Sequence, residues 1–133
     1  MAGNARYVEG VSKRHDFKHE REALSKGQNP FAAVLSCADS RIAPEYCFDT
    51  ARGDVFVCRV AGNFASEDIV ASLEYTVAVL NTPLILVLGH ESCGAIEATI
   101  TARATARVGL HAVTLLARQG DILVWRRIGV PGD

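Results

Sequence analysis

Short apolar runs alternate with amphipathic and polar stretches along the chain, and this pattern predicts its secondary structure. Three short runs predict strands: residues 31–36, 55–60 and 83–88. The first and third are apolar enough for strands buried on both faces. A helix is predicted to begin after Ser66, which is suited to cap its first turn. Its apolar residues share one face: Ile69, Leu73, Val77 and Leu80. A further helix is expected over residues 95–103.

Strands that alternate with helices predict an α/β fold, with a Rossmann-like, mainly parallel sheet flanked by helices. The two ends of the chain differ from this pattern. Residues 1–27 are polar and charged, and they predict an N-terminal helical arm. Two β-rich runs, 111–116 and 122–126, enclose a turn sequence and predict an antiparallel C-terminal edge strand or hairpin within residues 108–133. We expect residues 1–133 to form a single domain.

The composition excludes several classes of function. The 133 residues carry a formal net charge of −1, which gives no basis for nucleic acid or an anionic membrane surface as a partner. The sequence shows neither an export signal nor an apolar run long enough to span a bilayer. We therefore expect a cytoplasmic protein that acts on a small molecule. Its four cysteines are expected to stay reduced in that compartment.

Two motifs directly follow predicted strands: Cys37-Ala38-Asp39-Ser40-Arg41 and His90-Glu91-Ser92-Cys93. Open parallel sheets bind their ligands at the carboxyl ends of strands, so we expect the two motifs to meet there. Two thiolates and one imidazole, from Cys37, Cys93 and His90, are suited to Zn²⁺ and leave a fourth position for water. Cys47 and Cys58 lack suitably spaced partners and are interpreted as buried thiols.

Asp39 and Arg41 allow two interpretations. They are either a surface ion pair of little energetic weight or a catalytic pair. In the second case Arg41 keeps Asp39 ionised, and Asp39 accepts a hydrogen bond from zinc-bound hydroxide and orients it. Asp39 is also able to bind zinc as a fourth ligand, which would close the site.

At these residues the sequence resembles the beta-class carbonic anhydrases, whose signature is a C-x-D-S-R segment followed about fifty residues later by H-x-x-C. The stretches Arg59-Val60-Ala61-Gly62-Asn63 and Ser72-Leu73-Glu74-Tyr75 are also similar, and the resemblance covers residues 17–100. It implies zinc bound by Cys37, His90 and Cys93, and a catalytic pair of Asp39 and Arg41. After Ile100 the sequence departs from the family, which indicates an internal shortening or a truncated or altered product.

The resemblance also implies a substrate site and an assembly. Substrate binding is assigned to Gln28, Phe56, Tyr75 and Gly94. Turn hydrogen bonds are an equally good role for Gln28, and ordinary core packing is the simpler role for Phe56 and Tyr75. The family forms homodimers or larger assemblies, with the N-terminal helices around the partner.

The function implied is the zinc-dependent reversible hydration of carbon dioxide to bicarbonate and a proton by zinc-bound hydroxide. Three alternatives remain at this point. The same site would suit a carbonyl sulfide or carbon disulfide hydrolase, or a catalytically inactive zinc-binding scaffold. A thiol redox protein is a weaker alternative, because the chain has no C-x-x-C pair.

Overall fold

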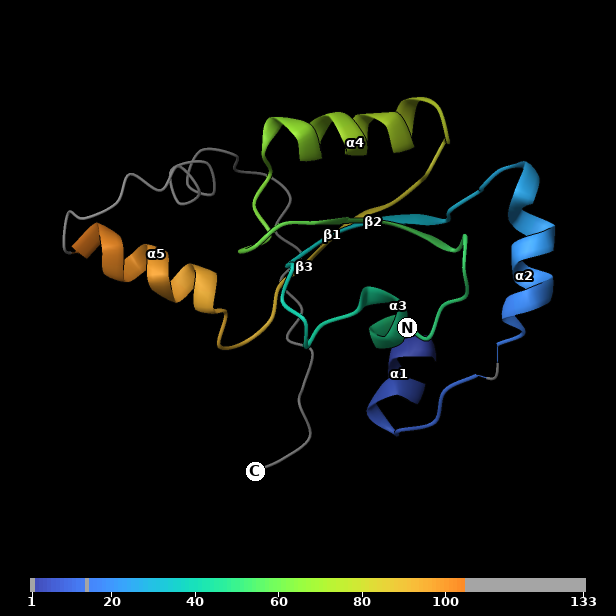
Figure 1. Cartoon of the computed structure of the whole chain (residues 1–133), viewed down its shortest axis with the longest axis horizontal. Coiled ribbons are helices and arrows are strands. Elements are labelled where there is room, and N and C mark those ends of the chain that lie inside the picture. Colours follow the sequence, from blue (N-terminus) through green and yellow to red (C-terminus); the bar gives the residue numbers. More distant parts are fainter. Residues whose placement is uncertain (1, 14, 105–133) are drawn as a thin grey trace.

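A parallel sheet forms the centre of the computed structural model, which describes residues 2–13 and 15–104 (Figure 1). Its strands are β1 (Ala32–Ser36), β2 (Val55–Arg59) and β3 (Ile85–Leu88), in the order β2-β1-β3. All five residues of β1 are buried, as expected for an apolar strand with a neighbour on each side. The predicted parallel α/β fold is therefore confirmed.

Helices lie on both sides of this sheet (Figure 1). On one side, α4 (Glu67–Ala78) packs on β1 and β2, and Ser66 caps it by accepting a hydrogen bond from the Ile69 amide. On the other side lies α3 (Pro44–Phe48), which the sequence pattern did not predict. The last described helix, α5 (Gly94–Ala104), follows β3 after a short turn.

The apolar face predicted for α4 is only partly buried, since Ile69 and Leu73 are half-buried. Thr76 is fully buried, with its hydroxyl donating to the Leu73 carbonyl at 2.7 Å, whereas Val77 is 48% exposed. An internal hydrogen bond removes the cost of burying the threonine hydroxyl, so this polar residue takes the core position.

The N-terminal part contains α1 (Ala2–Val8), α2 (Phe17–Ala23) and a 3-10 helix (Leu24–Lys26). α1 packs on α3, where Asn4 Nδ2 donates to the Cys47 carbonyl at 3.0 Å and Arg6 pairs with Asp49. The predicted C-terminal hairpin lies outside the described residues. Among residues 2–13 and 15–104, every helix is too short or too polar to cross a bilayer.

Candidate metal centre

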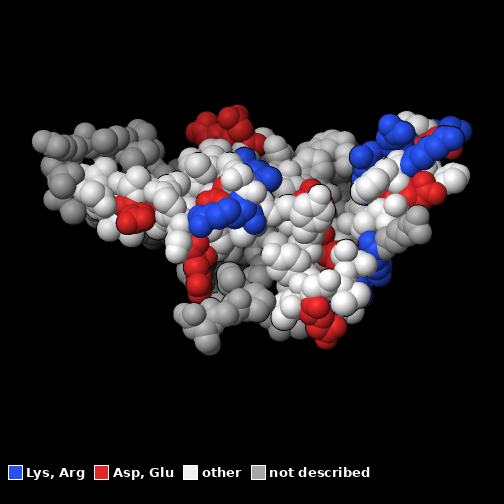
Figure 2. Space-filling view, turned by 60° about the horizontal axis from the view of Figure 1, so that its bottom comes forward, with Lys and Arg blue, Asp and Glu red and all other residues white. Residues whose placement is uncertain are grey.

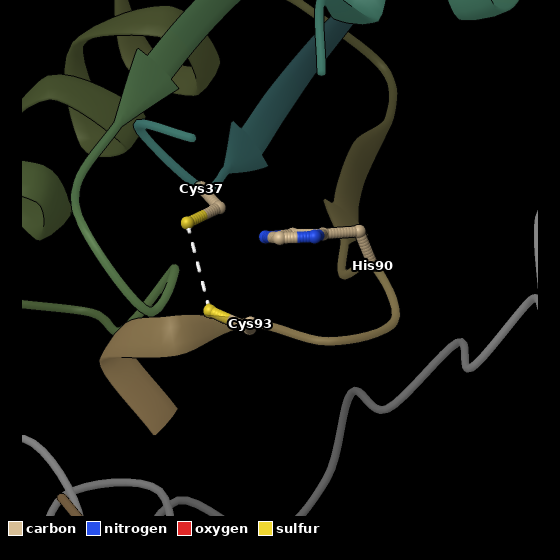
Figure 3. A group of neighbouring side chains, drawn as sticks. All are labelled: Cys37, His90 and Cys93. Carbon is tan, nitrogen blue, oxygen red and sulfur yellow. Dashed lines mark hydrogen bonds between the residues drawn. The ribbon is translucent and has the colours of Figure 1, made fainter. Parts of the chain in front are cut away.

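Three potential metal ligands converge at the carboxyl edge of the sheet. Cys37 directly follows β1, and His90 and Cys93 lie in the turn between β3 and α5 (Figure 3). The sulfur atoms of the two cysteines are 3.8 Å apart, and one ligand atom from each residue lies within 4.8 Å of the others. A tetrahedral zinc ion with Zn–S bonds of about 2.3 Å separates two sulfur ligands by about 3.8 Å. The spacing in the structure therefore matches that geometry.

The histidine ring is oriented for metal binding. His90 Nδ1 lies 2.9 Å from the Glu91 carbonyl oxygen, to which it donates, so Nε2 carries the free lone pair. Nε2 is buried without a hydrogen-bond partner, and Figure 3 shows the ring directed toward the two sulfur atoms. A buried nitrogen acceptor without a partner is costly unless a ligand occupies it. This atom, together with the two thiols, fits a zinc ion.

The Cys37 thiol lies in surroundings that favour its thiolate form. Its residue is 2% exposed, and this burial opposes ionisation. Hydrogen bonds to the sulfur outweigh burial, among them one from the Gly62 amide at 3.3 Å, and the pKa of Cys37 falls to about 7. Gly62 has a φ of 82°, which favours glycine at this position. Since zinc binds thiolates, the turn after β2 prepares Cys37 as a ligand.

Asp39 is paired with Arg41 beside the three ligands. The Arg41 guanidinium donates to both carboxylate oxygens, at 2.9 and 2.8 Å, and also to the Ser92 carbonyl at 3.1 Å. These bonds hold the pKa of Asp39 well below its usual range, so its carboxylate stays ionised. Its Oδ2 is 3.8 Å from His90 Nε2. The structure thus places a fixed acceptor at the edge of the metal centre.

The family assignment follows from the match of residues 32–124 to the family model described as carbonic anhydrase. The chain belongs to the beta-class carbonic anhydrase family. A carbonic anhydrase of Mycolicibacterium smegmatis is 48% identical over 101 residues, covering 75% of this chain and 49% of the relative. Carbonic anhydrase 2 of Mycobacterium tuberculosis is 46% identical over 101 residues, which again cover 75% of this chain and 49% of the relative. The chain spans about half the length of these curated relatives.

Solved beta-carbonic anhydrases have the same fold. The structure of CcaA aligns with a TM-score of 0.61 at 33% identity, covering 65% of this chain and 45% of that one. The Coccomyxa beta-carbonic anhydrase, solved in complex with acetazolamide, aligns with a TM-score of 0.59 at 40% identity. The alignment covers 62% of this chain and 39% of the Coccomyxa chain. The family match ends at residue 124 and so includes most of the predicted C-terminal hairpin sequence.

The substrate-site residues implied by the family resemblance do not all lie near the metal centre. Gly94 begins α5, next to Cys93. Gln28 is exposed and precedes β1, so it lies at the opposite edge of the sheet from Cys37. Phe56 and Tyr75 contact each other with ring centroids 6.3 Å apart. Phe56 pairs with the second residue of β1, three residues or about 10 Å before the end of that strand. Within one chain, these last three residues are therefore separated from the ligands.

One residue at the site was not recognised from the sequence. Arg59 belongs to a stretch that resembles the family, but the sequence alone assigns it no role. In the structure it is the last residue of β2, and its guanidinium donates to the Cys37 carbonyl at 2.9 Å. The sequence does hold a signal for this contact: Arg59 lies at the end of a predicted strand, as does Ser36, which directly precedes the Cys37 motif.

Proposed function

We propose that this chain catalyses the reversible hydration of carbon dioxide to bicarbonate and a proton, with zinc bound by Cys37, His90 and Cys93. The observation that carries the proposal is the meeting of these three ligands beside an ionised Asp39 at one sheet edge. Zinc with three protein ligands acidifies water and so supplies a hydroxide nucleophile near neutral pH.

Asp39 orients the attacking water in this proposal. Its carboxylate is only an acceptor while Arg41 keeps it ionised, and it therefore accepts a hydrogen bond from a water placed beside the ligands and orients that water. The Asp39 side chain is 18% exposed and the Arg41 side chain 61%, so the acceptor faces a partly enclosed site while the guanidinium reaches solvent. Arg41 also contacts the Ser92 carbonyl, which links this pair to the turn that carries His90 and Cys93.

Substrate binding is completed, we propose, in a homodimer or larger assembly of this chain. Tyr75 is 45% exposed although it is a large aromatic residue, and Gln28 is exposed as well. A second copy would cover these residues and bring them to its own metal centre, where Gly94 already lies. The proposal for Gln28, Phe56, Tyr75 and Gly94 rests on the family resemblance and on this exposure.

A compartment that keeps thiols reduced suits this site, and we place the protein in the cytoplasm for that reason. All four cysteines are free thiols in the structure. A disulfide between Cys37 and Cys93 would remove two of the three ligands.

Stopped-flow hydration of carbon dioxide by the zinc-loaded chain at pH 7 and pH 8.5 tests the function. We expect turnover at both values and its loss in Asp39→Ala, with Asp68→Ala, an exposed residue of α4, as the matched control. Activity at the higher pH alone would indicate that Asp39 binds zinc in acid. Absence of activity at both, with zinc bound, would exclude the hydration function. Carbonyl sulfide and carbon disulfide would then be tested on the same protein.

A further inference from the structure

Arg59 is an exposed residue whose guanidinium bonds the loop that carries one metal ligand and the catalytic carboxylate. We call residues 37–42 the ligand loop, since it begins at Cys37 and includes Asp39. Arg59 ends β2 and is paired in register with Ser36, the last residue of β1. Its side chain therefore starts beside the first residue of the loop.

Three backbone carbonyls of the ligand loop accept hydrogen bonds from this one guanidinium. Arg59 Nε donates to the Cys37 oxygen at 2.9 Å. Arg59 Nη2 donates to the oxygens of Asp39, at 2.8 Å, and Ile42, at 2.9 Å. These acceptors belong to the first, third and last residues of the loop. The planar guanidinium holds its N–H donors in fixed directions and is therefore suited to bond three carbonyl oxygens at once. A lysine ammonium is a point charge on a flexible chain and lacks these fixed directions.

The remaining bonds of the ligand loop do not replace these contacts. The Ile42 amide donates to the Asp39 oxygen at 3.1 Å, which closes a tight turn within the loop. The Ala38 amide donates to the Val60 oxygen at 3.2 Å, which extends the strand pairing by one residue. Two further bonds fix side chains of the loop: the Gly62 amide donates to Cys37 Sγ at 3.3 Å, and the Arg41 amide donates to Asp39 Oδ1 at 2.9 Å. Arg59 is therefore the side chain that bonds backbone carbonyls at the start, the middle and the end of the loop. Carbonyl oxygens that converge also repel one another unless a donor lies between them.

The geometry points to Arg59 as a positioning residue: its three carbonyl contacts hold Cys37 and Asp39 in one fixed arrangement for zinc binding and catalysis. The catalytic part of this inference rests on the proposed function. Arg59 differs from Arg41 in its target, because Arg41 contacts the carboxylate itself and Arg59 contacts only the backbone of the loop. Arg59 thus acts through the residues it orients.

Two substitutions test this role, Arg59→Lys and Arg59→Gln, in the full chain. The matched controls are Arg52→Lys and Arg52→Gln, because Arg52 is an exposed arginine that lies over the Phe17 ring at 5.4 Å. Zinc affinity is measured by competition with a chromogenic chelator. The ligand field is measured by the visible absorption of the protein loaded with Co²⁺ in place of zinc.

We expect both Arg59 variants to bind zinc about 10- to 100-fold more weakly, as is usual when a group that orients a metal ligand is lost. The cobalt bands should shift, and both Arg52 variants should match the unchanged protein. Arg59→Lys retains a positive charge, so the same loss in both variants shows that the fork geometry is needed.

Unchanged zinc affinity and cobalt spectra in both Arg59 variants would overturn the inference. A loss of zinc affinity accompanied by unfolding of the zinc-free Arg59→Lys protein, seen by circular dichroism, would overturn it too, because Arg59 would then support the fold in general. Neither readout depends on turnover. Failure of the unchanged protein to hydrate carbon dioxide would therefore reject the proposed function and leave the positioning role standing on its metal readouts.

Discussion

The two edges of the sheet differ in how complete they are within one chain. At the carboxyl edge, side chains that follow β1 and β3 meet at distances that fit a zinc ion, and Arg59 at the end of β2 orders the loop between them. At the opposite edge, Gln28 and Tyr75 are exposed, although the family resemblance assigns them to the substrate site. The three potential metal ligands thus meet within one chain, whereas the residues of the proposed substrate site do not.

The largest effect is expected from removing a ligand at the carboxyl edge. Cys93→Ser should abolish tight zinc binding and hydration, a greater loss than the about 100-fold that changes beside the ligands cause. Cys58→Ala is the control, because Cys58 is also a free thiol but is buried in β2, outside the group of three, whereas Cys93 is half-buried. Metal content after dialysis and stopped-flow rates are the measurements. Retained zinc in Cys93→Ser would show that this thiol is not a ligand.

A smaller effect is expected at the residue that orients the nucleophile. Asp39→Asn keeps the shape of the side chain but removes its charge and its bidentate pairing with Arg41. Hydration should fall by about 10²- to 10³-fold, the range for loss of one fixed hydrogen-bonding group at a reacting centre, while zinc content stays the same. Equal activity of Asp39→Asn and the unchanged protein would reduce the Asp39–Arg41 pair to a surface ion pair.

The carboxyl edge was also the part that the sequence predicted best. Cys37 and His90 follow apolar runs that end as strands, and the carboxyl ends of parallel strands share an edge, so local sequence is sufficient to bring them together. Asp39 and Arg41 are two residues apart, so their pairing needs no distant contact.

Other features depend on contacts that the pattern of the chain does not show. α3 has only five residues, of which Pro44 and Cys47 are buried against the rest of the fold, and its sequence has no helical repeat long enough to detect. The apolar repeat places Val77 on the same face of α4 as Ile69 and Leu73, yet Val77 is exposed and the neighbouring Thr76 is buried. Arg59 acquires its role from carbonyls that lie 17 to 22 residues away.

The pH dependence of stability should distinguish the thiol at the metal centre from the other thiols. In the zinc-free protein the pKa of Cys37 is lowered from 9.0 to about 7, while burial raises the pKa values of Cys47 and Cys58. Between pH 7 and 9 the unfolded chain keeps the Cys37 proton that the folded chain has lost. Cys37 therefore stabilises the fold increasingly as the pH rises through this window, and its contribution disappears as the pH falls through 7.

Urea unfolding of the zinc-free protein at pH 6.5, 7.5 and 8.5 measures this contribution. We expect the free energy of unfolding of the unchanged protein to rise with pH relative to that of Cys37→Ser. Cys58→Ala should retain the rise, since its thiol is not ionised in that range. An identical pH dependence in Cys37→Ser and the unchanged protein would mean that other groups cause it.

The smallest effect is expected at the opposite edge. Tyr75 contacts Phe56 through tilted rings, so Tyr75→Ser should lower the free energy of unfolding by about 1 kcal/mol, the contribution of such a pair. Zinc affinity should not change, because Phe56 pairs with the second residue of β1, about 10 Å along the strand before the end that carries Cys37. Tyr46→Ser is the control, since Tyr46 is 76% exposed and makes no ring contact among the described residues.

Sedimentation of the zinc-loaded Tyr75→Ser and Tyr46→Ser proteins then tests whether the chain self-associates through this edge. Weaker self-association in Tyr75→Ser alone would support a second copy at this edge, whereas weaker zinc binding would show that the two edges are not independent.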